Sequence, residues 1–87
     1  MIESRTTRRF WRLFAALPED VQQDAKRAYR LFRDNPAHPG LHFKRLEGES
    51  DIYSVRLGLN YRAVAVLKGS RAVWYWIGDH ADYDRLN

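Results

Sequence analysis

Cysteine is absent from this chain of 87 residues, and so is any long run of apolar residues. Without cysteine there is neither a disulfide framework nor a thiolate metal site. No run of about 18 apolar residues marks a membrane span, and no charged-then-apolar leader marks a secretion signal. We therefore expect a cytoplasmic protein with no membrane partner. A chain of this length supports one domain, which we expect to span residues 1 to 87.

Lysine is also scarce, and arginine takes its place. The chain has 15 basic and 11 acidic residues, a formal net charge of +4 and a pI near 9.8. Only three of the basic residues are lysine, and the other twelve are arginine. A planar guanidinium binds phosphate or carboxylate at two points and stacks on rings, which an ammonium does not. The bias favours a nucleic-acid or acidic protein partner, although GC-rich coding also raises the arginine share.

The first third of the chain has the spacing of two amphipathic helices. In residues 6 to 17, apolar side chains recur at helical intervals, while Arg8, Arg9 and Arg12 occupy the other side. A second apolar stripe follows in residues 18 to 35. Two helices joined so tightly should form a hairpin. The basic side of the first helix is either a solvated face or a surface for RNA phosphates or an acidic protein segment.

The character of the chain changes at residues 35 to 40, a loop with two prolines and a glycine, after which β-branched and aromatic residues dominate. We expect strands at residues 42 to 47, 52 to 57, 61 to 67 and 71 to 77. Short turns join them, so neighbouring strands should be antiparallel. The predicted architecture is α+β: an N-terminal helical hairpin packed on one face of a four-stranded antiparallel sheet. The other face stays partly open, and residues 1 to 5 are a candidate fifth strand at the edge.

The middle hairpin places two arginines against each other. If its loop is residues 58 to 60, Arg56 lies directly opposite Arg62, with the Cβ atoms roughly 5 Å apart. A loop of two or four residues would shift the register and separate the pair. Either a nearby acid neutralises the two charges, or the guanidinium groups form a clamp for an incoming phosphate. The candidate acids are Glu47, Glu49 and Asp51.

The preceding strand adds further charges. Arg45 and Glu47 are two positions apart and share one face of that strand, whereas Lys44 lies on the other. An acid beside a base on a sheet face is most often a surface ion pair. The alternative is that Glu47 accepts a proton or holds a catalytic arginine in place.

The last strand ends in an ionisable cluster. Trp74 and Trp76 are two positions apart, so we expect both to point to the same side and to pack in the core. Gly78 permits a sharp turn into a short helical segment on which His80 and Tyr83 share one face and can act together. The carboxylates at positions 79, 82 and 84 scatter around that segment without a metal-binding spacing, so no metal site is expected.

Four segments occur in an order that resembles the RelE/ParE superfamily of bacterial toxins from toxin–antitoxin operons. They are LPEDVQ, NPAHPGLHFKRLEG, IYSVRLGLNYRAV and the ending WIGDHADYDRL, so the resemblance covers nearly the whole chain. It implies a microbial-RNase-like fold whose RelE-type members cleave messenger RNA, often in the ribosomal A site, without a metal or other cofactor. It also implies a cognate antitoxin that wraps the helices or the open sheet face, with a homodimer or a toxin–antitoxin heterotetramer as the assembly. ParE-type members instead poison DNA gyrase and lack the catalytic set.

The resemblance also implies roles for individual residues. It gives Arg62 as the catalytic arginine, His80 or Tyr83 as the C-terminal catalytic residue, Lys44 or Arg45 as the first strand's basic residue, Glu47 as its acidic residue, and Arg56 as the arginine of YSVR. The expected reaction is attack of a 2′-hydroxyl on the adjacent phosphate, which needs a base, an acid and fixed positive charge. His80 suits either proton transfer, and Tyr83 or Glu47 the other. The rival functions are a gyrase inhibitor and a non-catalytic relative that binds RNA or an acidic partner.

Overall fold

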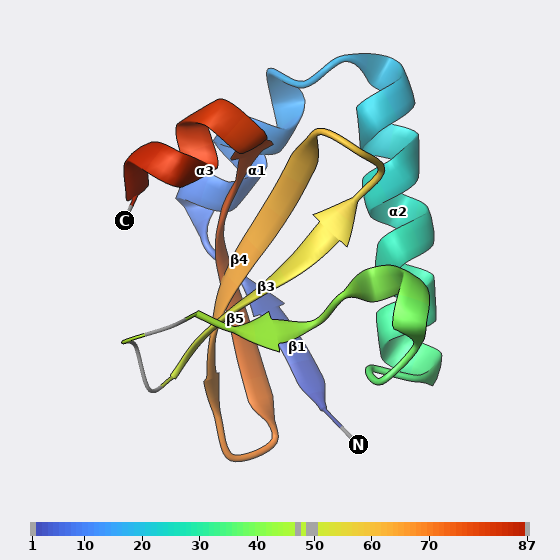
Figure 1. Cartoon of the computed structure of the whole chain (residues 1–87), viewed down its shortest axis with the longest axis vertical. Coiled ribbons are helices and arrows are strands. Elements are labelled where there is room, and N and C mark those ends of the chain that lie inside the picture. Colours follow the sequence, from blue (N-terminus) through green and yellow to red (C-terminus); the bar gives the residue numbers. More distant parts are fainter. Residues whose placement is uncertain (1, 47, 49–50, 87) are drawn as a thin grey trace.

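The computed structural model describes residues 2 to 46, 48 and 51 to 86, and it has the predicted α+β architecture (Figure 1). In chain order the elements are β1 (Glu3–Thr6), α1 (Arg8–Ala15), α2 (Glu19–Asp34), a short 3₁₀ helix η1 (Pro39–Leu41), β2 (Lys44–Arg45), β3 (Ile52–Leu57), β4 (Tyr61–Lys68), β5 (Arg71–Asp79) and α3 (His80–Leu86). In the part of the chain that the structure describes, no helix is long and apolar enough to cross a membrane.

One five-stranded sheet forms the centre of the molecule, in the order β1-β5-β4-β3-β2. Strands β2 to β5 form the predicted antiparallel series, and the candidate edge strand is present as β1. β1 pairs with β5 in parallel, which makes the sheet mixed rather than wholly antiparallel. Thr7 N donates to Trp74 O at 3.0 Å, and Glu3 Oε1 lies 2.9 Å from Arg71 Nε. These contacts hold both ends of the short edge strand.

The two N-terminal helices form the predicted hairpin. α1 begins at Thr7, whose side-chain oxygen accepts a hydrogen bond from Phe10 N at 3.1 Å and so satisfies one free amide of the first turn. Gln22 of α2 donates through Nε2 to Phe14 O at 3.0 Å and to Leu17 O at 3.3 Å. The Gln22 side chain of α2 therefore caps free carbonyl groups at the C-terminal end of α1.

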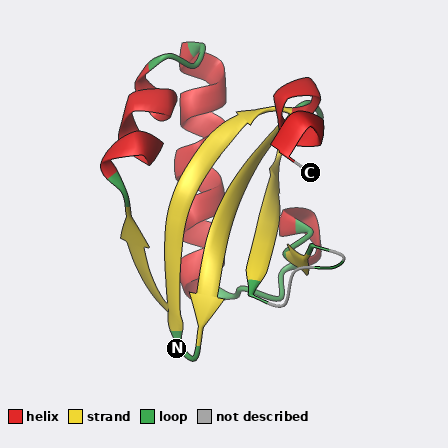
Figure 2. Cartoon of the chain, turned by 90° about the vertical axis from the view of Figure 1, so that its left-hand side faces the viewer, coloured by secondary structure: helices red, strands yellow, loops and turns green. Residues whose placement is uncertain are grey.

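The main core lies between these helices and the sheet. Phe32 of α2 meets Trp74 of β5 edge to face at a ring-centroid distance of 5.3 Å, and Phe43 at 5.0 Å. Phe10 of α1 joins the same cluster. In Figure 2, α2 runs behind the sheet, whereas α3 lies in front of it at one end. The face that we expected to be partly open is therefore covered at that end by α3.

The strand predicted at residues 42 to 47 is shorter than expected. Among the described residues of that range, Lys44 and Arg45 alone have strand pairing. The strand begins late because η1 occupies residues 39 to 41 and His42 adopts a left-handed backbone with φ of 48°. The chain straightens only after that turn. Residue 47 lies outside the described residues.

The prediction that Trp74 and Trp76 share a face is wrong. In the β4–β5 pairing Val64 is opposite Trp76 while Ala65 is opposite Trp74, so Tyr75 is an extra residue on β5. Such a bulge breaks the alternation of side chains along a strand. Trp74 therefore packs on the helix side, and Trp76 packs on the other face with Val64. β5 also continues to Asp79, beyond the predicted end at residue 77.

Candidate active site

Two arginines stand side by side on the sheet face that carries α3. The β3–β4 register pairs Arg56 with Arg62 and Leu57 with Tyr61, which confirms the predicted three-residue loop. Gly58 has a φ of 66°, a backbone conformation that glycine adopts without steric cost, and it begins that loop. Arg56 Nε donates to Gly58 O at 2.9 Å, so the side chain is held beside the loop.

The Arg56–Arg62 pair has no counterion within the described part of the chain. No carboxylate there lies within 4.0 Å of either guanidinium. Asp51, one of the acids considered for this role, instead lies 3.3 Å from Lys68 Nζ. The other two candidates, at positions 47 and 49, lie outside the described residues. Two adjacent cations without a described counterion favour the binding of an anion.

Tyr83 brings the arginine pair and the C-terminal histidine together. The guanidinium carbon of Arg62 lies 5.2 Å from the centroid of the Tyr83 ring, within range of a cation–π interaction. His80 stacks on the same ring with a centroid distance of 6.2 Å and an interplanar angle of 19°. Tyr83 itself is only 9% exposed. The expectation that His80 and Tyr83 share a face is confirmed, and the Tyr83 ring contacts both His80 and Arg62.

Trp76 and Gly78 of β5 form the part of the sheet against which Tyr83 packs. The Trp76 ring lies 6.3 Å from that of Tyr83, in the small core cluster on this face. A Cβ on Gly78 would lie 2.7 Å from both Cζ2 and Cη2 of Trp76, so the indole covers the glycine. Gly78 is paired in register with Arg62. Sequence reasoning missed the role of Trp76, although a glycine two residues after a tryptophan in a strand is a signal of close ring approach.

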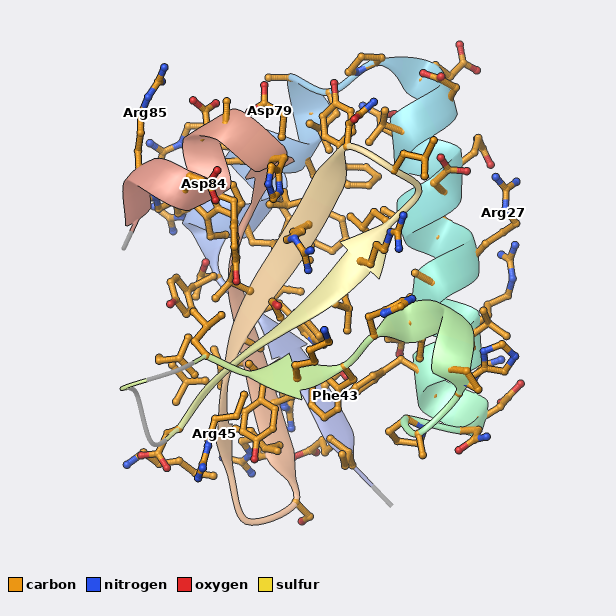
Figure 3. All side chains as sticks on the ribbon, viewed as in Figure 1. Arg27, Phe43, Arg45, Asp79, Asp84 and Arg85 are labelled. Atoms are coloured by element: carbon orange, nitrogen blue, oxygen red, sulfur yellow. The ribbon has the colours of Figure 1, made fainter. Side chains whose placement is uncertain are left out.

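The start of α3 is held by backbone contacts. His80 N donates to Asn60 O at 2.6 Å, which ties the helix to the β3–β4 loop, and Asp79 Oδ1 accepts from Asp82 N at 2.8 Å. The side chain of His80 remains 56% exposed, with Nε2 3.6 Å from Asp84 Oδ2. Figure 3 shows Asp79 and Asp84 together at the α3 end of the sheet. The backbone of His80 is therefore held in place, while its imidazole is open to solvent.

The two basic residues of β2 lie on different faces. Lys44 is paired with Ser54 of β3. Arg56 is two positions from Ser54 along β3, so Lys44 lies on the same face of the sheet as Arg56. Arg45 is paired with Tyr53 on the opposite face. In Figure 3 Arg45 is at the far end of the sheet from Asp79. The geometry thus joins Lys44, and not Arg45, to the candidate site.

The basic residues of α1 are not brought into this site. Arg8, Arg9 and Arg12 are exposed on a helix whose Phe10 packs into the helix-side core. Between these three and Arg62 or His80, the structure as described records no hydrogen bond or ion pair. Within the same residues, no group of three or more histidine, cysteine, aspartate or glutamate side chains is placed to hold a metal ion. Glu47 lies outside the described residues.

Comparisons with known proteins identify the family and the fold. The family model of the ParE-like toxin domain matches residues 19 to 85. No curated protein matches the chain. Among solved structures, a chain of the RelB–RelE antitoxin–toxin complex from Methanococcus jannaschii is similar at 16% identity, with a TM-score of 0.77 over 95% of this chain and 99% of that one. YafQ from E. coli is similar at 10% identity and a TM-score of 0.76, over 95% and 98%. The YoeB/ParE toxin from Agrobacterium tumefaciens has 16% identity and a TM-score of 0.72, over 91% and 99%.

Proposed function

The chain belongs to the ParE-like toxin domain family, within the RelE/ParE superfamily, and we propose that it is a RelE-like toxin that cleaves messenger RNA without a metal. The observation that carries the proposal is the meeting of Arg62 and His80 at the ring of Tyr83, beside a second arginine with no described counterion. That set contains a phosphate-binding charge and a proton-transfer group on one open face.

The proposed reaction is an internal transfer at one phosphate of RNA. A base removes the proton of the 2′-hydroxyl, the oxygen attacks phosphorus, and the 5′-oxygen leaves with a proton from an acid. The products are a cyclic phosphate and a 5′-hydroxyl. Arg56 and Arg62 stabilise the charge on the phosphorane, while Lys44 binds a neighbouring phosphate. Each proton transfer contributes about 10²–10⁴-fold to the rate.

His80 is the described side chain best suited to one of the proton transfers. An imidazole has one nitrogen that can accept a proton and one that can donate it, and here the ring is exposed while its backbone is held by Asn60 O. The Tyr83 hydroxyl is the candidate for the other transfer, since the stacked rings place the two groups next to each other. Glu47 remains the alternative that the sequence suggests.

The proposed partners are those of a RelE-like toxin. One of the similar solved structures is an antitoxin–toxin complex, which supports a cognate antitoxin as partner. We propose that the protein acts in the cytoplasm on messenger RNA associated with the ribosome and so inhibits translation. A homodimer or a heterotetramer with the antitoxin is the proposed assembly.

A growth and cleavage experiment tests this function. The wild type, the double variant Arg62→Ala/His80→Ala and the control Arg27→Ala are induced in bacteria without an antitoxin. Arg27 is an exposed residue of α2 outside the site. We expect growth arrest and messenger RNA cleavage, with 5′-hydroxyl ends, from the wild type and the control only. Arrest by the double variant as strong as that of the wild type would show that the catalytic assignment is wrong.

The match to a ParE-like toxin domain, together with the resemblance to ParE-type toxins, supports a second candidate function, inhibition of DNA gyrase. This activity needs a protein-binding surface and no proton transfer. It predicts inhibition of gyrase supercoiling in vitro and a DNA-damage response in cells, with intact transcripts. Measuring transcript ends and supercoiling on the same induced cells separates the two functions.

A further inference from the structure

The β3–β4 loop is joined to two groups of the candidate active site through its backbone. Arg56 Nε donates to Gly58 O at 2.9 Å, and His80 N donates to Asn60 O at 2.6 Å. The first hydrogen bond holds a guanidinium, and the second holds the first residue of α3. Leu59 lies between the two residues that supply these carbonyls, so its position is tied to both groups.

The loop is also held by the elements around it. In Figure 1 it lies between the start of α3 and the helix α2. The helix α2 is close, because a Cβ on Gly58 would lie 3.4 Å from Asp24 Oδ2. Leu57, immediately before the loop, is buried in the main core. The hairpin is therefore anchored at its base and on both sides.

The Leu59 side chain, at the tip of this loop, is left uncovered. It is 82% exposed, compared with 40% for Leu31 of α2. A single exposed leucine is common on protein surfaces and indicates no function by itself. This leucine differs because the residues on either side of it bind Arg56 and His80. A ligand at those two groups would lie next to a free apolar side chain.

Leu59 is within reach of a nucleotide bound at the arginine pair. It lies three positions beyond the pairing of Arg56 with Arg62. At about 3.3 Å per residue, its Cα is at most about 10 Å from that pair along the hairpin. This distance is comparable to the length of one nucleotide. The base next to a phosphate on the arginines can therefore touch Leu59.

We infer that Leu59 packs on the base of an unpaired nucleotide beside the cleaved phosphate and so adds to the affinity for single-stranded RNA, an inference that rests on the proposed nuclease function. The leucine side chain has no hydrogen-bonding atom, so it contacts the face of a base and reads none of its edges. Every base has such a face, so we expect the contact to raise affinity without selecting a sequence. In a duplex, stacked neighbours cover these faces, and the contact is lost.

A thermodynamic cycle between the protein and its ligand tests this contact. The ligand is a short 2′-O-methyl RNA, which lacks the attacking hydroxyl, with a sequence in which the wild type cleaves the unmodified RNA at one mapped site. Affinity is measured for the intact RNA and for versions with the base removed at one position beside that site. Removing the contacting base should weaken wild-type binding roughly three- to tenfold, the scale expected for burying part of one leucine side chain. Leu59→Ser should weaken binding of the intact RNA to the same extent, and removing that base should then cause no further loss.

Kinetics separate a base contact from a change in the loop. The hydrogen bonds of Arg56 and His80 go to backbone carbonyls, so replacing the Leu59 side chain should leave both in place. We expect Leu59→Ser to raise KM for RNA cleavage by roughly three- to tenfold and to keep kcat within about twofold. Leu59→Met keeps an apolar side chain and should resemble the wild type. The matched control Leu31→Ser, at an exposed leucine of α2, should change neither constant.

Circular dichroism of each variant confirms that it is folded. Equal affinity of the wild type and Leu59→Ser for intact RNA, additive losses in the cycle, or a lower kcat with an unchanged KM would each overturn the inference. The proposed nuclease function can survive that result, because it is tested by the loss of cleavage in Arg62→Ala/His80→Ala. A wild type that neither binds nor cleaves RNA would overturn both.

Discussion

Replacing Gly78 by alanine tests whether packing on the sheet holds the charged groups in place. The added Cβ would lie 2.7 Å from Cζ2 and Cη2 of Trp76, closer than carbon atoms pack. Gly78 does not have a left-handed φ, so alanine is compatible with its backbone. The indole must therefore move, and its neighbour on that face is the ring of Tyr83. The substitution thus disturbs the support of Arg62 through one added methyl group.

The magnitude follows from the cost of overpacking. Forcing a methyl group into a packed contact costs about 1–3 kcal/mol, part of which is the loss of the Trp76–Tyr83 ring contact, itself about 0.5–1.5 kcal/mol. In a domain of this size each kcal/mol lowers Tm by about 4–8 °C. We expect Gly78→Ala to lower Tm by roughly 5–20 °C. The rate of RNA cleavage, measured well below the new Tm, should also fall. Arg62 and His80 both contact the Tyr83 ring, which moves when the Trp76 indole moves.

Thermal unfolding followed by circular dichroism measures the first effect. The matched control is the same substitution made in a Trp76→Leu background, where the smaller side chain leaves room for the methyl group. Gly78→Ala should cost less stability there than in the wild type, and the difference is the coupling energy of the pair. A Tm within about 1 °C of the wild type, or an equal cost in both backgrounds, would refute the reasoning.

Three further predictions concern charge and ring chemistry. Tyr83→Phe keeps the ring beneath Arg62, so affinity for 2′-O-methyl RNA should be retained while the cleavage rate falls about 10²-fold or more; Tyr83→Leu should lower both. Arg56→Ala should weaken RNA binding and lower the slope of log affinity against log salt by about one, measured by titration from low to moderate salt. The hydrogen bond from Arg71 and the charge of Arg5 hold the pKa of Glu3 below its ordinary value of 4.5. Its contribution to stability is therefore present above that pH and lost as pH falls through the lowered pKa, so the Tm difference between the wild type and Glu3→Gln should shrink in acid.

The features that the sequence predicts best depend on local spacing. The helical hairpin follows from apolar residues at intervals of three and four, and Pro18 separates its two helices. The register of Arg56 against Arg62 follows from a three-residue loop that starts with Gly58. In each case a few neighbouring residues set the geometry, so counting along the chain is sufficient.

The features that the sequence does not predict depend on contacts from outside the segment. The bulge at Tyr75 puts Trp74 against Phe32 on one face and Trp76 against Tyr83 on the other. With strict alternation, two tryptophans two positions apart would lie on the same face of β5. The bulge instead places one tryptophan ring on each face. The parallel pairing of β1 is likewise set by the position of β5, which lies far away in the sequence.

Packing and charge are linked at the arginine pair. Two unit charges about 5 Å apart in water repel by about 0.8 kcal/mol, which is a small cost for a surface site. The interaction of Arg62 with the Tyr83 ring stabilises the pair by about 0.5–1 kcal/mol, which offsets the repulsion. Arg56 also donates a hydrogen bond to Gly58 O. The pair can therefore persist without a carboxylate between its members. A carboxylate there would stabilise the free protein but would also compete with any phosphate, whereas an aromatic ring orients the guanidinium and leaves its charge available. The buried ring of Tyr83 thus orients a guanidinium whose charge no carboxylate of the described residues neutralises.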